Sequence, residues 1–234
     1  MRLDRYLSKH QGLSRQTILK QLQLRQISVD GQVVLDRHFE VNQFSKISLE
    51  GRLIEPQQAI YTMLHKPAGI LSATEDPIHP TAIDLIDINN TNNLHIAGRL
   101  DRATTGLLIL TNDGKWSRHL TEPQQKIPKK YWVETLLEIS NETALRFQEG
   151  IYFAYEDLTT SPAEIEVITA KTCYLTIYEG RYHQVKRMFK ALGNRVVKLH
   201  REKMGEIVLD KHLKPGDFRA LSQTEIDSVW QKQR

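Results

Sequence analysis

The middle of the chain reads GRLDRATTG at residues 98–106 and continues as LLIL at residues 107–110. A short, fully apolar run between polar turn signals is typical of a strand that is buried on both faces. Gly98 and Gly106 permit a tight backbone at each end of the polar segment before this run. The pattern therefore predicts a buried central strand, and it places Asp101 in a constrained loop directly before that strand.

Asp101 lies between Arg99 and Arg102 in this loop. A carboxylate in such a position can form a turn, cap a helix or take part in a structural ion pair. It can also belong to an active site, where the hydroxyl groups of Thr104 and Thr105 would orient the carboxylate or its loop. Taken by themselves, these residues leave the structural and the catalytic interpretation open.

On either side of the predicted strand, strand patterns outnumber helical ones. The clearest helix lies after Gly180, where Val185, Met188, Phe189 and Leu192 recur at helical spacing. The fold class is therefore predicted to be α+β, with a larger domain of mixed type built mainly on antiparallel sheet. Further strands are expected at residues 60–64, 131–137, 164–168, 174–178, 196–199 and 207–209, a last helix at 224–230, and loops at 76–77, 79–80 and 89–93.

Residues 1–55 form a separate, smaller pattern. A polar, proline-containing stretch at residues 56–60 is the predicted linker to the larger domain, residues 61–234. The smaller domain is expected to contain a helix at residues 2–10, a second helix that Ser14 caps and that places Ile18, Leu19 and Leu22 on one face, a tight turn at Asp30-Gly31, and strands at 27–29, 33–34 and 47–49.

The charge of the chain is unevenly distributed. The net charge is +4, with an isoelectric point of about 9.1. Residues 1–25 contain six Lys and Arg against one acid, and residues 181–203 contain eight against one. Residues 134–166 contain eight acids against one base. Two basic blocks separated by an acidic one predict one face that meets a polyanion and another that does not, and nucleic acid is favoured over a purely solvated surface.

Several classes of protein are excluded by what the sequence lacks. No apolar run approaches the roughly 18 residues that cross a bilayer, and the charged N-terminal residues lack the apolar core of a secretory signal. The single cysteine, Cys173, excludes an internal disulfide, and its strand-like surroundings favour a small core residue. The nine histidines show no metal-ligand spacing, and no phosphate-binding glycine loop or nucleophile elbow is present. We therefore expect a cytoplasmic protein that binds no metal and no other cofactor.

Four segments resemble, in this order, the sequence motifs of the pseudouridine synthases. They read HKPAG at residues 65–69, GRLDRATTGLLILTNDG at 98–114, KKY at 129–131 and EGRYHQVKRM at 179–188. More narrowly, the chain resembles the RsuA branch of this family, in which an S4-like RNA-binding domain precedes the catalytic domain. RLDRYL at residues 2–7 and VDG at 29–31 carry that second part of the resemblance. The resemblance covers nearly the whole chain.

The resemblance implies the isomerisation of a uridine in RNA to pseudouridine, in which the base leaves C1′ through N1 and returns through C5. Asp101 would be the nucleophile. An ionised carboxylate in a pocket needs a nearby cation, for which the resemblance indicates Arg181, with Lys186 as the alternative. Tyr131 would stack on the uracil, and its hydroxyl group would take part in proton transfer. Without the resemblance, an ordinary half-buried strand residue is the simpler interpretation of Tyr131.

Further residues are implied to bind the substrate. Arg99 would guide the uridine that is turned out of the RNA or fill the space it leaves, with a structural ion pair as the alternative. His65 and Lys66 would shape the pocket or contact phosphate, and Thr105 and Arg187 are further candidates. In the S4-like domain, the expected RNA contacts are Arg2, Arg5, Arg15 and Lys20.

The expected partner is ribosomal RNA, and the expected target is one uridine of the small-subunit (16S) rRNA, either free or in an assembling particle. Overall likeness to the small-subunit branch, including residues 179–188, favours this target over the large-subunit (23S) rRNA. The alternative from another class is a ribosome-assembly protein that binds rRNA without catalysis. We expect a monomer that has no membrane partner.

Overall fold

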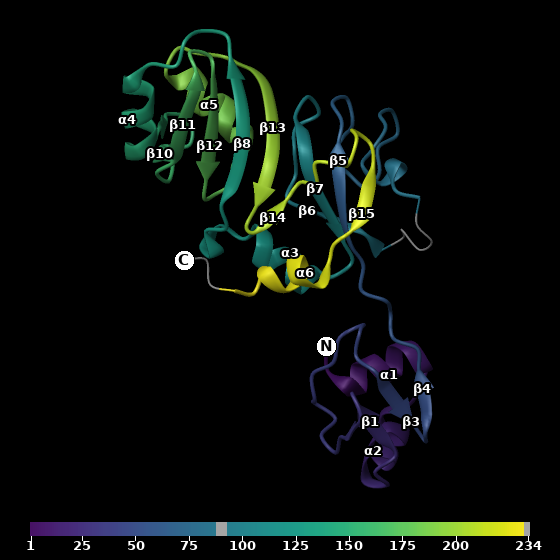
Figure 1. Cartoon of the computed structure of the whole chain (residues 1–234). Coiled ribbons are helices and arrows are strands. Elements are labelled where there is room, and N and C mark those ends of the chain that lie inside the picture. Colours follow the sequence, from purple (N-terminus) through teal and green to yellow (C-terminus); the bar gives the residue numbers. More distant parts are fainter. Residues whose placement is uncertain (88–92, 232–234) are drawn as a thin grey trace. The chain divides into compact units, whose positions relative to one another are not determined.

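Figure 1 shows the computed structural model, which describes residues 1–87 and 93–231. The chain divides into two compact units, Met1–Ala59 and Ile60–Arg234, which we call the N-terminal unit and the C-terminal unit. Residues 88–92, which make up most of the loop expected at residues 89–93, lie outside the described residues.

The N-terminal unit contains two helices, α1 (Leu3–Gln11) and α2 (Arg15–Gln23), which share an apolar core with an antiparallel sheet. Ser14 caps α2 as predicted, because its hydroxyl group accepts a hydrogen bond of 3.1 Å from the backbone amide of Thr17. Leu19, expected on the apolar face, is 37% exposed, since Ile18 and Leu22 set that face and each residue turns the helix by about 100°. The strand order is β2 (Gln32–Val33), β1 (Ile27–Val29), β3 (Ile47–Leu49) and β4 (Arg52–Ile54).

The C-terminal unit is built on one large sheet. Its described strands are β5 (Tyr61–Lys66), β6 (His95–Ala97), β7 (Thr105–Thr111), β8 (Lys129–Thr135), β11 (Glu164–Thr169), β12 (Thr172–Ile177), β13 (Val196–Met204), β14 (Ile207–Val208) and β15 (Phe218–Ala220). The strand order is β11-β12-β8-β13-β7-β5-β15, with β14 beside β13 and β6 beside β7 (Figure 1). Among these strands every pair is antiparallel except β13 with β7. This confirms the prediction of a mixed fold made mainly of antiparallel sheet.

The helices of the C-terminal unit are short. The apolar spacing after Gly180 correctly predicts α5 (Gln184–Ala191), and the pattern at residues 224–230 corresponds to α6 (Gln223–Ser228). Two further helices were not predicted, α3 (Gly114–Thr121) and α4 (Asn141–Glu149), which begin at the capping side chains of Asp113 and Ser140. The smaller elements are η1 (Ile83–Leu85), η3 (Pro123–Gln125), β9 (Tyr152–Phe153) and β10 (Leu158–Thr159).

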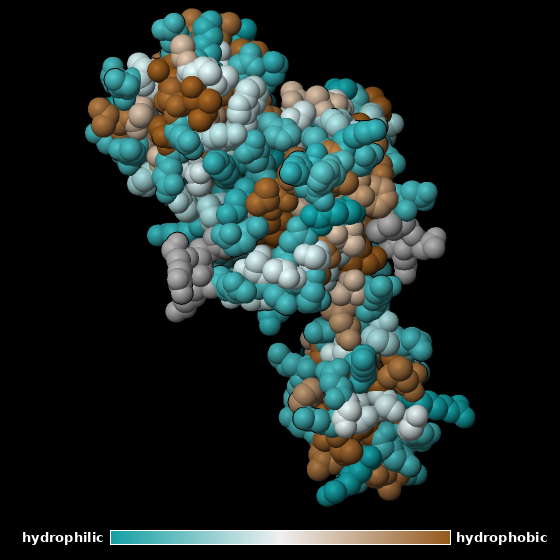
Figure 2. Space-filling view, viewed as in Figure 1, coloured by the Kyte–Doolittle hydropathy of each residue, from teal (hydrophilic) through white to brown (hydrophobic). Residues whose placement is uncertain are grey.

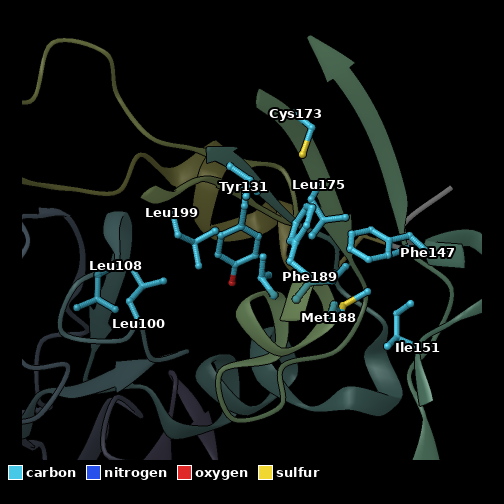
Figure 3. Close-up of a cluster of buried hydrophobic side chains, with 14 of the residues drawn as sticks. Leu100, Leu108, Tyr131, Phe147, Ile151, Cys173, Leu175, Met188, Phe189 and Leu199 are labelled. Carbon is cyan, nitrogen blue, oxygen red and sulfur yellow. The ribbon is translucent and has the colours of Figure 1, made fainter. Parts of the chain in front are cut away.

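The central strand β7 separates two apolar cores. Leu107 and Ile109 belong to one core, and Leu108 and Leu110 belong to the other, part of which is drawn in Figure 3. All four side chains are fully buried, which confirms the prediction of a strand covered on both faces. Cys173 lies in the second core as expected, and burial raises the pKa of its thiol to about 12, so that the thiol stays protonated near neutral pH.

Gly106 makes the one parallel strand pair of the described sheet possible. It lies opposite Arg201 of β13, and its φ is +106°. A Cβ atom at this position would lie 2.2 Å from the backbone oxygen of Arg201, far inside van der Waals contact. Only glycine therefore lets β7 and β13 approach each other here, and this approach fixes the start of the strand that follows Asp101.

The surface outside the cores is mainly hydrophilic in the view of Figure 2, where hydrophobic residues form small groups between hydrophilic ones. Exposed apolar side chains such as Leu137 and Leu145 are normal on a folded protein. Small, scattered apolar groups of this kind do not indicate a docking site.

Candidate active site

Asp101 lies between β6 and β7 and lines a cleft of about 800 Å³ in the C-terminal unit. One wall of the cleft is the loop at residues 98–102, and another is the segment at residues 180–185, which leads into α5. Tyr131 of β8 also lines the cleft. The Asp101 side chain is 23% exposed, so the carboxylate is accessible from the cleft without being freely solvated.

Two side chains from the start of α5 contact the Asp101 carboxylate. The Nζ atom of Lys186 lies 2.7 Å from Oδ2, and the Nε2 atom of His183 lies 3.2 Å from Oδ1. His183 precedes the helix in a left-handed conformation, with φ of +49°, which ends the preceding turn and starts α5. An ammonium group at 2.7 Å forms a short, charge-assisted contact with the carboxylate.

The cation beside Asp101 is therefore Lys186, the alternative, and not Arg181. The Nε atom of Arg181 donates a hydrogen bond of 3.1 Å to Oε2 of Glu179 instead. Glu179 is itself held in place, because it also accepts hydrogen bonds from the backbone amide of Ser161 and from the side chain of Gln184. The expected pairing of Arg181 with Asp101 was wrong, although Arg181 does line the cleft. His183, which the sequence analysis did not select, lies between these two cations in the same motif.

Lys66 holds the loop that carries Asp101 in place from inside the protein. Its side chain is fully buried, and Nζ donates hydrogen bonds to the backbone oxygens of Pro67, Arg102 and Thr104, at 2.9, 3.3 and 2.8 Å. Burial lowers the pKa of Lys66 to about 8, although the nearby Asp101 carboxylate opposes this shift. Of the two roles expected for Lys66, contact with phosphate does not fit, because its ammonium group is enclosed by backbone carbonyls, whereas these hydrogen bonds are compatible with shaping the pocket.

Arg201 supports the other side of the same loop and was not predicted. It is 1% exposed, and its guanidinium group donates to the backbone oxygens of Leu107 and Gly98 at 2.8 Å and of Arg99 at 3.4 Å. A guanidinium group is suited to this task because its donors point in fixed directions. The residue opposite Arg201 is Gly106, so a glycine inside an apolar strand was the available signal that another chain segment approaches closely.

Tyr131 lies in the wall of the cleft. It is 7% exposed and packs in the apolar core beside Leu199 (Figure 3). Lys129, two residues earlier on β8, also lines the cleft and is 5% exposed. Its Nζ atom donates to the backbone oxygen of Ile127 at 3.1 Å, and burial lowers its pKa to about 8.

The other predicted substrate-binding residues divide into two groups. Arg99 is exposed and lines the cleft, as a residue that meets RNA would. Thr105, His65 and Arg187 are not among the described residues that line it. Their contacts are internal: Thr105 Oγ1 lies 2.8 Å from Nδ1 of His200, His65 Nδ1 lies 2.8 Å from the backbone oxygen of Leu213, and Arg187 is paired with Glu156 over the ring of Phe153.

The acidic block and the second basic block, expected on separate faces, contact each other. Lys198 lies opposite Glu134 in the sheet, and its Nζ atom is 2.8 Å from the carboxylate. Arg187 of α5 is paired with Glu156, which lies between β9 and β10. The expected separation of charge was wrong here, because the register of β13 beside β8 places Lys198 next to Glu134. In the other pair, Arg187 extends over the ring of Phe153 to Glu156.

The predicted RNA-binding residues of the N-terminal unit are mostly free of such contacts. Arg5, Arg15 and Lys20 are exposed, and in the described part of the chain no carboxylate lies within 4.0 Å of them. Arg2 differs, because its guanidinium group is paired with Asp4. Three of the four residues are therefore available to an anion.

The described residues contain no helix long and apolar enough to pass through a lipid bilayer. They also contain no group of three or more His, Cys, Asp or Glu side chains that could hold a metal ion.

Comparisons with known proteins agree with one another. The model of the family described as RNA pseudouridylate synthase matches residues 60–191, which include Asp101, Tyr131 and Lys186. Ribosomal small subunit pseudouridine synthase A of Pseudomonas aeruginosa is 49% identical over 230 residues, which cover 98% of this chain and 100% of that protein. The protein of the same name from Escherichia coli K12 is 42% identical over 230 residues, with the same coverage. A solved structure described as a pseudouridylate synthase has a TM-score of 0.72 at 38% identity and covers 98% of this chain and 99% of that one.

Proposed function

Since this chain belongs to the RNA pseudouridylate synthase family, we propose that it converts one uridine of the small-subunit (16S) ribosomal RNA into pseudouridine. Two relatives named for the ribosomal small subunit, each matched over 98% of this chain, support that choice of RNA. The observation that carries the proposal is the Asp101 carboxylate, which lies in a cleft at 2.7 Å from the ammonium group of Lys186.

The reaction is an isomerisation that needs no other reactant. The bond between N1 of the uracil and C1′ breaks, and a bond between C5 and C1′ forms. C5 then loses its proton, and N1 gains a proton. An ionised carboxylate can start this sequence by attacking C1′, by attacking the base, or by removing the 2′ proton of the sugar. Asp101 is the group we assign to that step. Lys186 and His183 stabilise its charge and hold its two oxygen atoms in place.

The remaining roles follow from position. Tyr131, in the wall of the cleft, would stack on the uracil and keep the detached base in place, and its hydroxyl group would take part in proton transfer. Arg99, exposed beside Asp101, would guide the extruded nucleotide or fill the space it leaves in the RNA. Lys66 and Arg201 would position the loop from inside through hydrogen bonds to its backbone oxygens.

We also propose that residues 1–55 are an S4-like RNA-binding domain, joined by the linker at residues 56–60 to the catalytic domain at residues 61–234. Its exposed cations Arg5, Arg15 and Lys20 support this role, because cations without carboxylate partners can contact phosphate at little cost. The enzyme would act as a cytoplasmic monomer, on rRNA that is free or part of an assembling particle.

The test uses unmodified fragments of small-subunit and large-subunit rRNA, incubated with the full chain. We expect pseudouridine at one position of the small-subunit RNA, and a loss of at least about 10⁴-fold in rate for Asp101→Asn, with RNA affinity retained. Modification of the large-subunit fragment alone would overturn the choice of target. RNA binding without any modified uridine would replace the enzyme by an rRNA-binding protein, and full activity of Asp101→Asn would show that another group is the nucleophile.

A further inference from the structure

Tyr182 presents an aromatic ring at the entrance of the cleft. It lines the cleft and is 75% exposed. One face of its ring is stacked on His183, with ring centroids 3.9 Å apart and an angle of 18° between the planes. Because the residue is largely exposed and one face is covered, the opposite face of the ring is open to solvent.

The segment that carries this ring is held in place before any substrate binds. The backbone amide of Arg181 donates a hydrogen bond of 2.9 Å to the side chain of Gln184, and the Arg181 side chain is bonded to Glu179. The backbone oxygen of Tyr182 accepts a hydrogen bond of 3.4 Å from Arg187. A stacking surface fixed in this way loses little conformational entropy when a ligand covers it.

The surroundings of Tyr182 are suited to single-stranded RNA. Arg99 and Arg102 are exposed cations that line the same cleft. An aromatic face next to cations that can meet phosphate is the arrangement by which proteins bind unpaired nucleotides. Tyr131 cannot serve the same nucleotide, because it is 7% exposed and lies in the wall of the cleft and not at its entrance.

We propose that the open face of Tyr182 stacks on the base of a nucleotide that flanks the target uridine, and so forms a second base-binding subsite. This inference rests on the proposed function, since it takes the uridine to be at Asp101. The stack would also connect the flanking base to the reaction centre, because His183, on the covered face of Tyr182, contacts the Asp101 carboxylate.

The test measures RNA affinity with the full-length chain carrying Asp101→Asn, so that no reaction occurs, and with the same chain carrying Tyr182→Ala in addition. The RNA is a rRNA fragment that the wild-type enzyme modifies, together with variants in which one nucleotide on either side of the uridine is abasic. We expect Tyr182→Ala to weaken binding of the intact RNA by about 5- to 100-fold, the effect of one lost stacking contact. With the RNA that is abasic at the stacked position, the two proteins should bind equally well.

Two controls separate stacking from other effects. Tyr182→Phe should keep the affinity, because its ring can still stack. Tyr155→Ala removes a tyrosine that is 97% exposed but does not line the cleft, and it should leave the affinity unchanged. Equal weakening by Tyr182→Ala on every abasic RNA, or no weakening on the intact RNA, would overturn the inference. Failure of the proposed function is a different result, because the wild-type enzyme would then form no pseudouridine in the intact fragment.

Discussion

Two basic segments that look alike in the sequence behave differently in the structure. In residues 1–25, only Arg2 of the six cations has a carboxylate within 4.0 Å in the described part of the chain, and the other five are exposed. In residues 181–203, five of the eight cations are paired with carboxylates, and Arg201 is buried. A count of charges therefore identifies cations, but it does not tell which of them are free to bind RNA.

The difference suggests a division of work between the two segments. Exposed cations without carboxylate partners can neutralise phosphates and release counterions, which gives salt-dependent affinity. Cations that are paired or buried cannot leave their partners without cost, so they organise the protein itself. In residues 181–203 the partners include the Asp101 carboxylate and the backbone of its loop. We therefore expect RNA affinity to depend mainly on the first segment and organisation of the active site mainly on the second.

Lys186→Met should separate the two segments most strongly. It removes the ammonium group that lies 2.7 Å from Asp101, so the reaction rate at saturating RNA should fall by about 10²- to 10³-fold. Arg181→Met is the matched control, because this cation is bonded to Glu179, and we expect a loss of less than about 10-fold. The comparison is measured as single-turnover pseudouridine formation. An equal loss in the two variants would return Arg181 to the reaction centre.

Arg201→Met should reduce stability more than any substitution of an exposed cation. It leaves the backbone oxygens of Gly98, Arg99 and Leu107 without their donor, and we expect the free energy of unfolding to fall by about 2–4 kcal/mol. Arg15→Met, in the first segment, should change it by less than about 0.5 kcal/mol, because Arg15 is exposed. Urea unfolding of both variants checks this, and equal small changes would show that the loop does not depend on the buried guanidinium group.

The buried Lys66 should make the free energy of unfolding depend on pH. Burial lowers its pKa to about 8, whereas a lysine in the unfolded chain titrates near 10.5. The unfolded state then binds more protons than the folded state above pH 8, so the contribution of Lys66 to the free energy of unfolding rises with pH. Between pH 8 and about 9.5 we expect a rise of up to about 1 kcal/mol per pH unit from each such lysine.

The control for this pH effect is the second buried lysine. Lys129 has the same shift, so Lys66→Met should remove roughly half of the rise, and Lys66→Met with Lys129→Met should remove most of it. Denaturant unfolding at several pH values measures the slope. A slope unchanged in the double variant would show that the two ammonium groups are not the source.

Some elements of this structure can be predicted from the local sequence pattern, and others cannot. The strand β7 and the helix α5 were predictable because their apolar residues follow one period over a full element. The helices α3 and α4 were missed because each shows few apolar residues at helical spacing and takes its start from a capping side chain. The loop around Asp101 could be located from Gly98 and Gly106, both of which have positive φ.

The partner of Asp101 could not be chosen from the sequence. Arg181 and Lys186 are cations in one motif, and which of them meets the carboxylate depends on the left-handed turn at His183 and on Glu179, which binds Arg181. The role of Arg201 could not be predicted from the sequence either, since a cation on a strand usually faces water. Its burial follows from the register of β13 against β7, which is a contact between segments far apart in the chain.

The division of work is tested most directly by measuring RNA affinity against salt and the saturating single-turnover rate in two variants. For Arg5→Ala/Arg15→Ala/Lys20→Ala, we predict a logarithmic salt dependence that is shallower by about 2–3 and a rate close to that of the wild type. For Lys186→Met, we predict an unchanged salt dependence and a rate that is about 10²- to 10³-fold lower. The reverse pattern, with the salt dependence lost in Lys186→Met and the rate lost in the triple variant, would contradict the account.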